Sequence, residues 1–430
     1  MIQDINILKI RTESRNFYIF DGISNNIYKV NQDDYARISN QDFEGRSGVR
    51  DLSLSSTEIK KQVSSNAKTL IIELTEKCNL RCKYCVFDEE NKNSERKHGK
   101  KTVDISEVKK NVERFYGRAN KNEAFIVFYG GEPLLEIETI KEIVEYSNTL
   151  SNKKIKYSLT TNGTVFNKES TQFLVDNDFT LTISIDGPEA VNDKYRIKKN
   201  KQGTWRTILK SLKKIKKDHP QFYRERVAFN CVINNKEEIE DINNFFENSK
   251  IIDHNKVRFS AEISKSLEIN ESTSKRAISL FHEKGYYREN IPPIENGFMG
   301  ILIDKINYRK LDQEAPKGKK NCIPFANRTY IRAGGEIQFC ERIQNYSIIK
   351  DDTANLEEIS QRIHEEFNKF KENDCSKCFA YNFCEMCPAS FLVNGALSKD
   401  ISIKKCSAFR NDIKSAISLY IDKKELEEEK

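Results

Sequence analysis

The sequence predicts an α/β fold built on a parallel sheet, because apolar or β-branched runs alternate with segments of helical periodicity between residues 68 and 262. The runs expected to form strands are Thr69–Leu74, Ala124–Tyr129, Ile155–Thr160, Leu181–Asp186, Val227–Ile233 and Val257–Ala261. Between the first two, Asp104–Glu107 resembles the start of a capped helix, and Val108, Val112 and Phe115 follow on one face. In such folds the functional loops lie at the carboxyl ends of the strands.

Two further regions flank this alternation. Phe17–Ile38 predicts two strands joined around Gly22–Asn26 and then a short helix, whereas after residue 320 cysteines and turn residues replace the regular pattern. We therefore expect an N-terminal segment at residues 1–63, the alternating region at 64–310, and a cysteine-rich region with a C-terminal helix at 311–430. Lys210–Lys217 is expected to be the exposed face of a helix, with Leu212 and Ile215 turned inward.

Composition narrows the class of protein. The chain has 430 residues, of which 37% are hydrophobic and 32% charged, enough for a sizeable core. The net charge of +7 is modest for this length and does not indicate the concentrated basic surface that binding to nucleic acid requires. No run of apolar residues approaches the ~18–20 that are needed to span a bilayer. We expect a cytoplasmic protein without a nucleic-acid or membrane partner. Because the cytoplasm is reducing, we expect the 11 cysteines to bind metal and not to form disulfides.

Three of these cysteines directly follow the first expected strand. Cys78, Cys82 and Cys85 form a C-x3-C-x2-C pattern. Three thiolates can hold three irons of a 4Fe–4S cluster and leave the fourth iron open to the amino and carboxylate groups of S-adenosylmethionine (SAM). A zinc site would need a fourth ligand, and His98, in a polar loop, is the one histidine nearby. The spacing therefore favours an iron–sulfur cluster over zinc.

Polar motifs follow the next three expected strands. Gly130-Gly131-Glu132-Pro133 follows the second strand, where two glycines permit a close approach to a ligand and a carboxylate suits an ammonium group. Thr161-Asn162-Gly163 ends the third strand, Ser184-Ile185-Asp186-Gly187 ends the fourth, and Arg196 comes shortly after. Taken singly, each motif could be a turn, a loop breaker or a surface charge.

In this order the motifs resemble those of the radical SAM superfamily, in particular its branch with a cysteine-rich C-terminal SPASM domain. The resemblance covers roughly residues 68–410. It implies a partial (β/α)6 TIM-like barrel and an enzyme that cleaves SAM to a 5′-deoxyadenosyl radical. Glu132 would hold the SAM amino group and Arg196 its carboxylate. The residues implied to bind SAM are Tyr84, Phe87, Gly130, Gly131, Glu132, Asn162, Ser184, Asp186 and Arg196.

The cysteine-rich region resembles the SPASM arrangement. The resemblance assigns four cysteines to one closed auxiliary cluster and three to a second, which makes three 4Fe–4S clusters in all. The first group is Cys375, Cys378, Cys384 and Cys406, and the second is Cys322, Cys340 and Cys387. Two residues separate the fifth and sixth cysteines where the family usually has three.

Spacing alone also allows two zinc sites in the cysteine-rich region. The second group leaves its fourth ligand undetermined: an open iron, an unusual ligand, or Cys231. Because Cys231 lies in an apolar strand run, it is expected to be a buried small hydrophobe.

The resemblance implies a radical SAM peptide maturase, an oxidoreductase that abstracts hydrogen from a ribosomally made precursor peptide and installs a carbon–carbon, ether or thioether crosslink. An electron donor such as flavodoxin or ferredoxin would serve it. One alternative is an anaerobic sulfatase-maturing enzyme, which oxidises Ser or Cys to formylglycine. The other is a non-catalytic metal-binding or redox-sensing protein.

Two local features bear on this choice. The N-terminal segment loosely resembles a peptide-leader recognition element, which binds a leader by strand addition, although it could equally be a structural cap. Glu341, directly after Cys340, occupies the position of a catalytic acidic residue in sulfatase-maturing relatives. It is a candidate general base, or else the partner of Arg342 or a nearby lysine in an ion pair.

Overall fold

The computed structural model describes residues 7–38, 54–85, 87, 97–120, 124–150, 155–262, 265–284, 291–300, 303, 306, 322–343, 345–350, 354–384, 386–393 and 395–428, and every structural statement below concerns these. Its largest sheet has eight strands in the order β11-β10-β4-β5-β6-β7-β8-β9. The strands are β4 (Thr69–Glu73), β5 (Ala124–Tyr129), β6 (Ile155–Thr161), β7 (Thr180–Ser184), β8 (Val227–Ile233), β9 (Val257–Ala261), β10 (Arg328–Ile331) and β11 (Ile337–Gln338). Strands β4 to β9 are parallel, which confirms the predicted α/β fold.

The sheet does not close on itself, since β9 and β11 stand at opposite ends of the strand order. Strand β10 pairs with β4 in parallel, and β11 pairs with β10 in antiparallel orientation. Six parallel strands with an open edge are what a partial (β/α)6 barrel requires. The two added strands come from the cysteine-rich region, so this region extends the main sheet.

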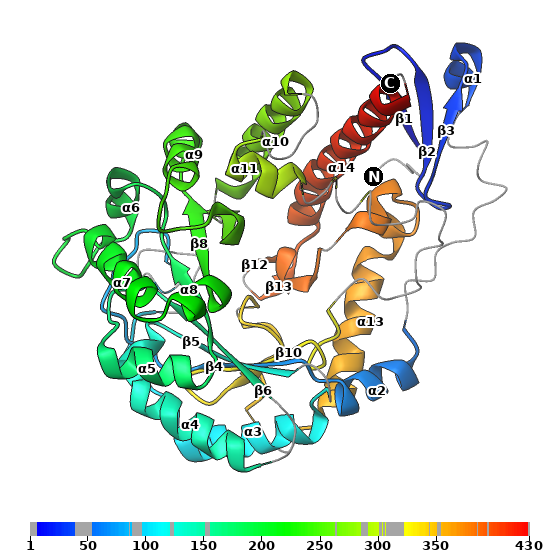
Figure 1. The fold of residues 1–430 in the computed structure, drawn as a ribbon. Coiled ribbons are helices and arrows are strands. Elements are labelled where there is room, and N and C mark those ends of the chain that lie inside the picture. The colour runs from blue at the N-terminus through cyan, green and yellow to red at the C-terminus, as the bar shows by residue number, and fades with distance from the viewer. Residues whose placement is uncertain are drawn as a thin grey trace.

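Helices follow the parallel strands and cover one face of the sheet (Figure 1). They are α3 (Ile105–Arg118), α4 (Ile137–Thr149), α5 (Lys168–Asp176), α6 (Glu189–Tyr195), α7 (Trp205–Asp218), α8 (Pro220–Arg226) and α9 (Ile239–Glu247), with the 3-10 turns η2 (Pro133–Glu136), η3 (Lys236–Glu238) and η4 (His254–Lys256). Alternate residues of β5 to β8 are buried against these helices, for example Phe128, Leu159 and Ile183. The residues between them point to the opposite face, called the inner face below, and stay at least partly exposed.

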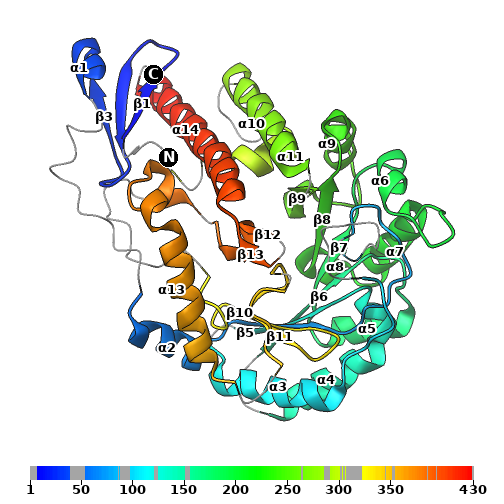
Figure 2. The same cartoon turned by 180° about the vertical axis from the view of Figure 1, so that it is seen from behind.

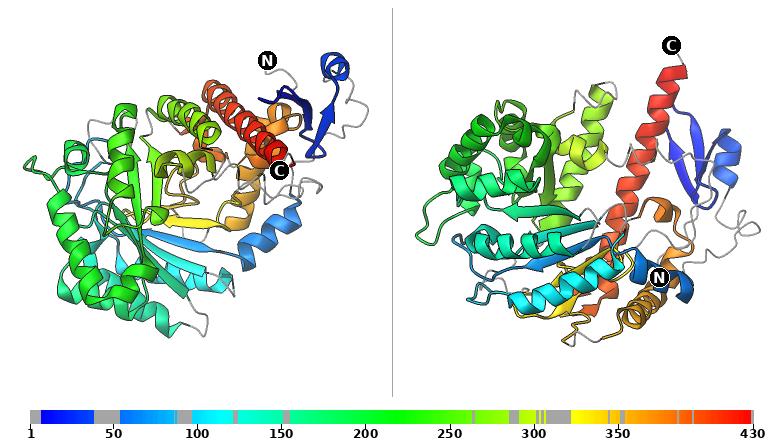
Figure 3. Two further views of the ribbon diagram at one scale, coloured as in Figure 1. Left: turned by 45° about the horizontal axis from the view of Figure 1, so that its top comes forward. Right: turned by 60° about the horizontal axis from the view of Figure 1, so that its bottom comes forward.

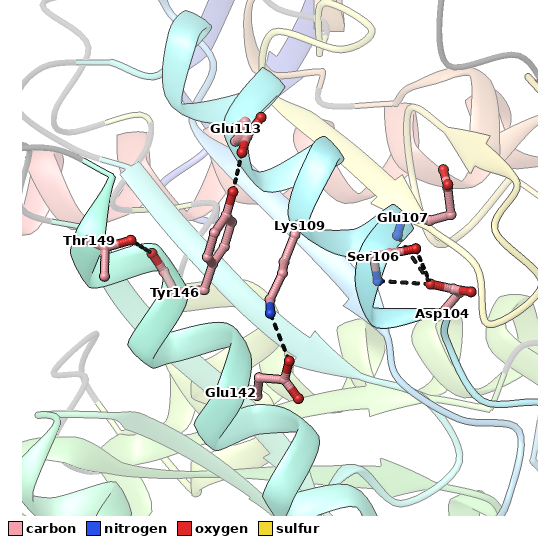
Figure 4. Close-up of polar contacts among 8 residues, drawn as sticks. All are labelled: Asp104, Ser106, Glu107, Lys109, Glu113, Glu142, Tyr146 and Thr149. Carbon is pink, nitrogen blue, oxygen red and sulfur yellow. Dashed lines mark hydrogen bonds and ion pairs between the residues drawn. The ribbon is translucent and has the colours of Figure 1, made fainter.

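Helix α3 begins as its sequence predicts. The Asp104 carboxylate accepts hydrogen bonds from the backbone N–H groups of Ser106 (2.8 Å) and Glu107 (3.3 Å) (Figure 4). Lys109 of α3 then pairs with Glu142 of α4 at 2.7 Å, so the two neighbouring helices are also linked on their exposed side. Such exposed pairs contribute little to stability. The apolar side of the helices, including Val112, therefore holds them on the sheet.

The lysine-rich segment also folds as predicted. Leu212 and Ile215 of α7 are buried, and most of the lysines in 210–217 are exposed. Further along the chain are α10 (Ser266–Glu283), α11 (Pro293–Glu295) and the π-helical turn η7 (Asn296–Gly300). No helix in the described ranges combines the length and the apolar character that crossing a bilayer needs.

The N-terminal segment is a three-stranded antiparallel sheet of β1 (Ile7–Arg11), β2 (Phe17–Asp21) and β3 (Asn26–Val30), followed by α1 (Gln32–Arg37). The sequence predicts β2, β3 and α1, whereas β1 was not predicted. Strand β1 lies on the side of the 30-residue helix α14 (Lys399–Glu428), and β3 forms the far edge (Figures 1 and 2). The N-terminal sheet and the C-terminal helix α14 thus lie side by side (Figures 1 and 3).

Apolar and polar contacts hold this small sheet on α14. Phe20 is fully buried in a cluster with Phe383, Ile417 and neighbouring apolar residues. The Tyr18 hydroxyl donates a hydrogen bond of 2.7 Å to Glu425 of α14.

The cysteine-rich region packs partly on helix α2 (Ser56–Ser65). It contains α13 (Leu356–Cys375), η8 (Phe379–Phe383), η9 (Pro388–Ser390), the hairpin of β12 (Leu392–Val393) and β13 (Ala396–Leu397), and α14. Ile59 and Val63 of α2 join Leu356 and Ile363 of α13 in one apolar cluster. The expected boundary at residue 63 lies inside α2, and the one at 310 lies outside the described residues, so the division into domains stays a prediction.

Replacing Phe20 by Ala should loosen the N-terminal sheet, because it empties a fully buried aromatic site, at a cost of about 3–5 kcal/mol. Hydrogen exchange should accelerate at residues 7–30. The control is Tyr28→Ala on β3, whose side chain is 44% exposed and whose loss should leave exchange unchanged. Equal protection in the two variants would contradict the packing described here.

Candidate active site

The first three cysteines lie on the loop that leaves the carboxyl end of β4. Backbone N–H groups of Leu80 and Phe87 point at the sulfurs of Cys78 and Cys85, each at 3.4 Å. The pKa of the Cys78 thiol is raised to about 11 and that of Cys85 to about 12, mainly by burial and in smaller part by the nearby Cys82. A bound metal would lower these pKa values, because it binds the deprotonated thiolates. The N–H groups of Leu80 and Phe87 would then stabilise the thiolates.

Within the described ranges, no three or more His, Cys, Asp or Glu side chains are grouped so that they could hold a single metal ion. A mononuclear zinc site needs all ligands about 2.0–2.3 Å from one centre, whereas the thiolates of a four-iron cluster bind different irons and lie farther apart.

The Gly130-Gly131 pair lets the loop after β5 pack directly against the cysteine loop. The N–H of Gly131 donates to the Thr75 carbonyl at 2.7 Å, and a Cβ atom on Gly131 would lie 2.2 Å from the Lys77 carbonyl oxygen. Gly130 has a φ of +139°, which L side chains rarely adopt. The backbone leading to Cys78 thus packs directly on these two glycines, and their contact with SAM stays a prediction.

Glu132 joins the ends of two strands. Its fully buried carboxylate accepts hydrogen bonds from the Thr161 hydroxyl (2.7 Å), the Asn162 N–H (2.7 Å) and the Leu134 N–H (3.1 Å). Burial raises the pKa of Glu132, and these hydrogen bonds act in the opposite direction. Glu132 thus fixes the loops after β5 and β6. Its contact with the SAM amino group stays a prediction.

A hydrogen-bonded chain connects the cysteine loop to two other predicted site residues. Arg196 donates from Nη1 to the Tyr84 hydroxyl at 2.6 Å, and this hydroxyl donates to Asp186 at 2.6 Å. The other Asp186 oxygen accepts the Val232 N–H at 3.0 Å. Tyr84 sits between Cys82 and Cys85, so the chain fixes this loop to the end of β7 and the end of α6.

Arg196 also presents an unused donor. It is 5% exposed, and its Nε has no hydrogen-bond partner among the described residues. A buried donor without a partner costs free energy, so this N–H is suited to a bound anion. The carboxylate of SAM is such an anion, and the residues present therefore fit the expected cofactor.

The remaining predicted SAM contacts are close to the same loops. Asn162 donates from Nδ2 to Asn79 at 2.9 Å, and its Oδ1 accepts from the Thr164 N–H at 3.0 Å. Ser184 ends β7, where it is partly exposed. Phe87 is buried with its ring centroid 6.1 Å from that of His98. The structure thus gathers the predicted residues at the carboxyl ends of β4 to β7.

The C-terminal cysteines fall into two neighbourhoods. Burial raises the pKa of Cys375 to about 12, and its neighbours Cys384, Cys378 and Cys406 contribute to the same shift. In the second neighbourhood, Cys322 lies near Cys387. The side chains of Arg328 and Glu341 lie near both Cys322 and Cys340. Cys231, by contrast, is fully buried in β8 on the side that faces the helices, as expected of a small hydrophobe.

Glu341 lies between a cysteine and an arginine. One carboxylate oxygen pairs with Arg328 Nη1 at 2.6 Å, and the other lies 3.3 Å from the Cys340 sulfur. The sequence suggests Arg342 or a lysine as a partner in an ion pair, and the structure adds Arg328 of β10, which the sequence did not suggest. Sequence order gave no signal for it, because Arg328 lies 13 residues away.

The comparison with protein families agrees with this geometry. Residues 72–248 match the Radical SAM superfamily model, and they form a radical SAM domain. The chain is 32% identical over 186 residues to the cysteine-type anaerobic sulfatase-maturating enzyme of Clostridium novyi, an alignment that covers 41% of this chain and 47% of that enzyme. The chain thus matches about half the length of this relative.

Two broader similarities cover more of the chain. It is 24% identical to the radical SAM cyclopropyl synthase TigE of Paramaledivibacter caminithermalis over 359 residues, 79% of this chain and 70% of that protein. The solved structure of anSMEcpe with bound AdoMet (SAM) superposes with a TM-score of 0.62 at 19% identity, covering 82% of this chain and 98% of that one. At this identity the superposition shows the fold.

Gly131→Ala should disrupt the cysteine loop, because the added Cβ would overlap the Lys77 carbonyl. Such overpacking costs about 1–3 kcal/mol, and we expect less bound iron and slower SAM cleavage after anaerobic reconstitution. Gly117→Ala is the matched control, since nothing lies within 4 Å of its added Cβ. Full iron content in Gly131→Ala would show that the close approach of the two loops is dispensable.

Proposed function

We propose that this chain is a radical SAM maturase that modifies a ribosomally made precursor peptide by installing a carbon–carbon, ether or thioether crosslink. The observation that carries the proposal is the buried, unused donor of Arg196, held beside the cysteine loop by Tyr84 and Asp186. It provides an anion site next to three thiols at the carboxyl ends of parallel strands, where ligands bind in this class of fold.

Each residue has a proposed task. Cys78, Cys82 and Cys85 hold the cluster; together, the bound cluster and SAM supply a 5′-deoxyadenosyl radical that abstracts hydrogen. Arg196 binds the SAM carboxylate, and Glu132 with the backbone of Gly130 and Gly131 receives the amino group. The other residues proposed to contact SAM are Tyr84, Phe87, Asn162, Ser184 and Asp186.

The C-terminal cysteines are proposed to hold two auxiliary 4Fe–4S clusters. Cys375, Cys378, Cys384 and Cys406 form one complete ligand set. Cys322, Cys340 and Cys387 form the other, whose fourth position is open to a substrate group or to the Glu341 carboxylate beside Cys340. Glu341 is also the proposed general base, and to take a proton it has to exchange its contact with Arg328.

The N-terminal sheet is proposed to bind the leader of the precursor. Strand β3 is the edge strand away from α14, and its residues Tyr28 and Lys29 are exposed. An edge strand offers unpaired N–H and C=O groups to which an extended peptide can add. An electron donor such as flavodoxin or ferredoxin would serve the enzyme in the cytoplasm.

Sulfatase maturation is the second candidate. The similarity to the Clostridium novyi enzyme and the carboxylate of Glu341 next to Cys340 favour it. Incubation of the reconstituted enzyme with SAM and each substrate separates the two. A mass change and a crosslink in the peptide encoded by a neighbouring short reading frame support the maturase, whereas formylglycine in a sulfatase peptide supports the alternative.

Replacing Cys78, Cys82 and Cys85 together by Ala should abolish 5′-deoxyadenosine production while iron stays bound in the C-terminal region. The control is Cys231→Ala, which removes a cysteine outside the proposed ligand sets and should retain iron and cleavage. Chromatographic measurement of 5′-deoxyadenosine and iron analysis provide the readouts. Continued cleavage by the triple variant would refute the proposed function.

The double variant Tyr28→Glu, Lys29→Glu should weaken precursor binding, because it places two carboxylates on the edge of β3 where the leader is proposed to add. SAM cleavage without peptide should persist, because these residues lie in the separate N-terminal sheet. Calorimetric titration with the precursor measures the effect. If the variant binds the precursor as tightly as the wild type does, the N-terminal sheet is a structural cap.

A further inference from the structure

The inner face of the sheet is accessible although it lies inside the fold. On β5 to β8 the burial pattern alternates strictly, with every helix-facing residue buried and every inner-face residue at least partly exposed. A closed barrel would fill this face with packed side chains. The open sheet of this chain leaves it exposed to solvent or to a ligand.

Polar groups on this face have unused hydrogen-bonding capacity. Four such residues that are not assigned to SAM lie on the adjacent strands β6, β7 and β8: Ser158, Thr160, Thr182 and Asn230. Their side chains make no hydrogen bond to other described residues. Hydroxyl and amide groups both donate and accept, so they can bind the backbone of a peptide.

Two cations border these groups. Lys156 on β6 is exposed, and its Nζ lies 5.4 Å from the ring centroid of Phe125, its register partner on the inner face of β5. Arg258 on β9 is exposed and is the register partner of Asn230 on β8. Within the described part of the chain neither cation forms an ion pair.

The carboxylates near this face already have partners. Glu73 of β4 accepts a hydrogen bond from the hydroxyl of Tyr330, and Glu341 pairs with Arg328. The charge that remains uncompensated among these groups is therefore positive, contributed by Lys156 and Arg258. A guanidinium and an ammonium group in such a position favour carboxylates, the former in bidentate geometry.

We infer that the inner face binds an acidic peptide segment, in which Asp or Glu side chains pair with Lys156 and Arg258 while the hydroxyl and amide groups bind the peptide backbone. This inference rests on the proposed function, because it takes the substrate to be a peptide. It specifies the substrate class further: the part of the peptide that lies toward the amino ends of β6 and β9 should carry carboxylates. Electrostatic attraction would also speed encounter with such a peptide at low salt.

The test uses three synthetic peptides of about 12 residues, which in extended form are longer than one strand of the sheet. One contains Gly, Ser and Glu, and in the other two Gln or Lys replaces every Glu. Calorimetric titration of the reconstituted, SAM-loaded full chain should show binding of the Glu peptide alone, weakening as salt rises. Lys156→Gln and Arg258→Gln should each weaken it about three- to fivefold, whereas Arg258→Lys should keep most of the affinity.

Lys213→Gln is the matched control, because it removes an exposed lysine from α7 on the other side of the sheet and should leave peptide affinity unchanged. Equal affinity for the three peptides, no binding of the Glu peptide, or an equal loss in Lys213→Gln would overturn the inference. SAM cleavage by the wild-type protein is measured in parallel. Its absence would count against the proposed function, whereas the peptide preference is decided by the titration alone.

Discussion

The candidate site depends on the hydrogen bonds that link the side chains of Arg196, Tyr84 and Asp186. Tyr84 lies between two of the three cysteines, Asp186 at the end of β7, and Arg196 at the end of α6. Backbone hydrogen bonds from Arg81 to Ile197 and from Lys83 to Tyr195 hold the same loop beside the end of α6. Because Asp186 and Arg196 are buried and Tyr84 is hydrogen-bonded to both, the geometry of the three side chains is set before any cofactor binds.

A second constraint acts on the same loop from the β5 side. The Gly130-Gly131 turn approaches so closely that the N–H groups of Gly131 and Glu132 reach the carbonyls of Thr75 and Lys77, respectively. The Glu132 carboxylate then ties this turn to the end of β6. The cysteine loop is therefore held from both sides, by backbone contacts from β5 and by side chains from β7 and α6. The order of the strands in the sheet brings these contacts together, since β4, β5, β6 and β7 are consecutive neighbours.

Local signals explain which parts of the fold could be predicted. Strands with strict alternation, such as Val227–Ile233, and capped helices, such as that after Asp104, carry their pattern in a few adjacent residues. Strand β10 pairs with β4 across more than 250 residues, and no local pattern marks such a pairing. The ion pair of Glu341 with Arg328 depends on this pairing, so it could not be predicted either.

The candidate site shows the same division. The order of motifs along the chain was enough to select the residues that the structure gathers at the carboxyl ends of β4 to β7. Their mutual contacts were not accessible from sequence, because the Tyr84 hydroxyl meets Asp186 across 102 residues and Arg196 across 112. Strand β1 was missed for a similar reason. Its residues, ILKIR, form a strand because they pair with β2 and pack on α14, and these partners are not visible in the local sequence.

The N-terminal sheet and the cysteine-rich region fix each other's position. Gly22, at the turn after β2, lies so close to Phe379 that an added Cβ would be 2.3 Å from its Cα atom, and Asn382 donates a hydrogen bond of 3.2 Å to the Gly22 carbonyl. Phe379 and Asn382 belong to η8, which runs between Cys378 and Cys384. Helix α14 adds a second connection, because it carries Cys406 in its first part and the partner of Tyr18, Glu425, near its end.

Any peptide held by the N-terminal sheet would thus be held at a fixed distance from these cysteines. A rigid helix rises about 1.5 Å per residue, so the separation along α14 does not depend on a flexible linker. A leader-binding element on a flexible linker would increase only the local concentration of its peptide. Docked on η8 and α14, the same element can also set the direction from which the peptide enters, since its edge strand β3 points away from the helix that carries Cys406.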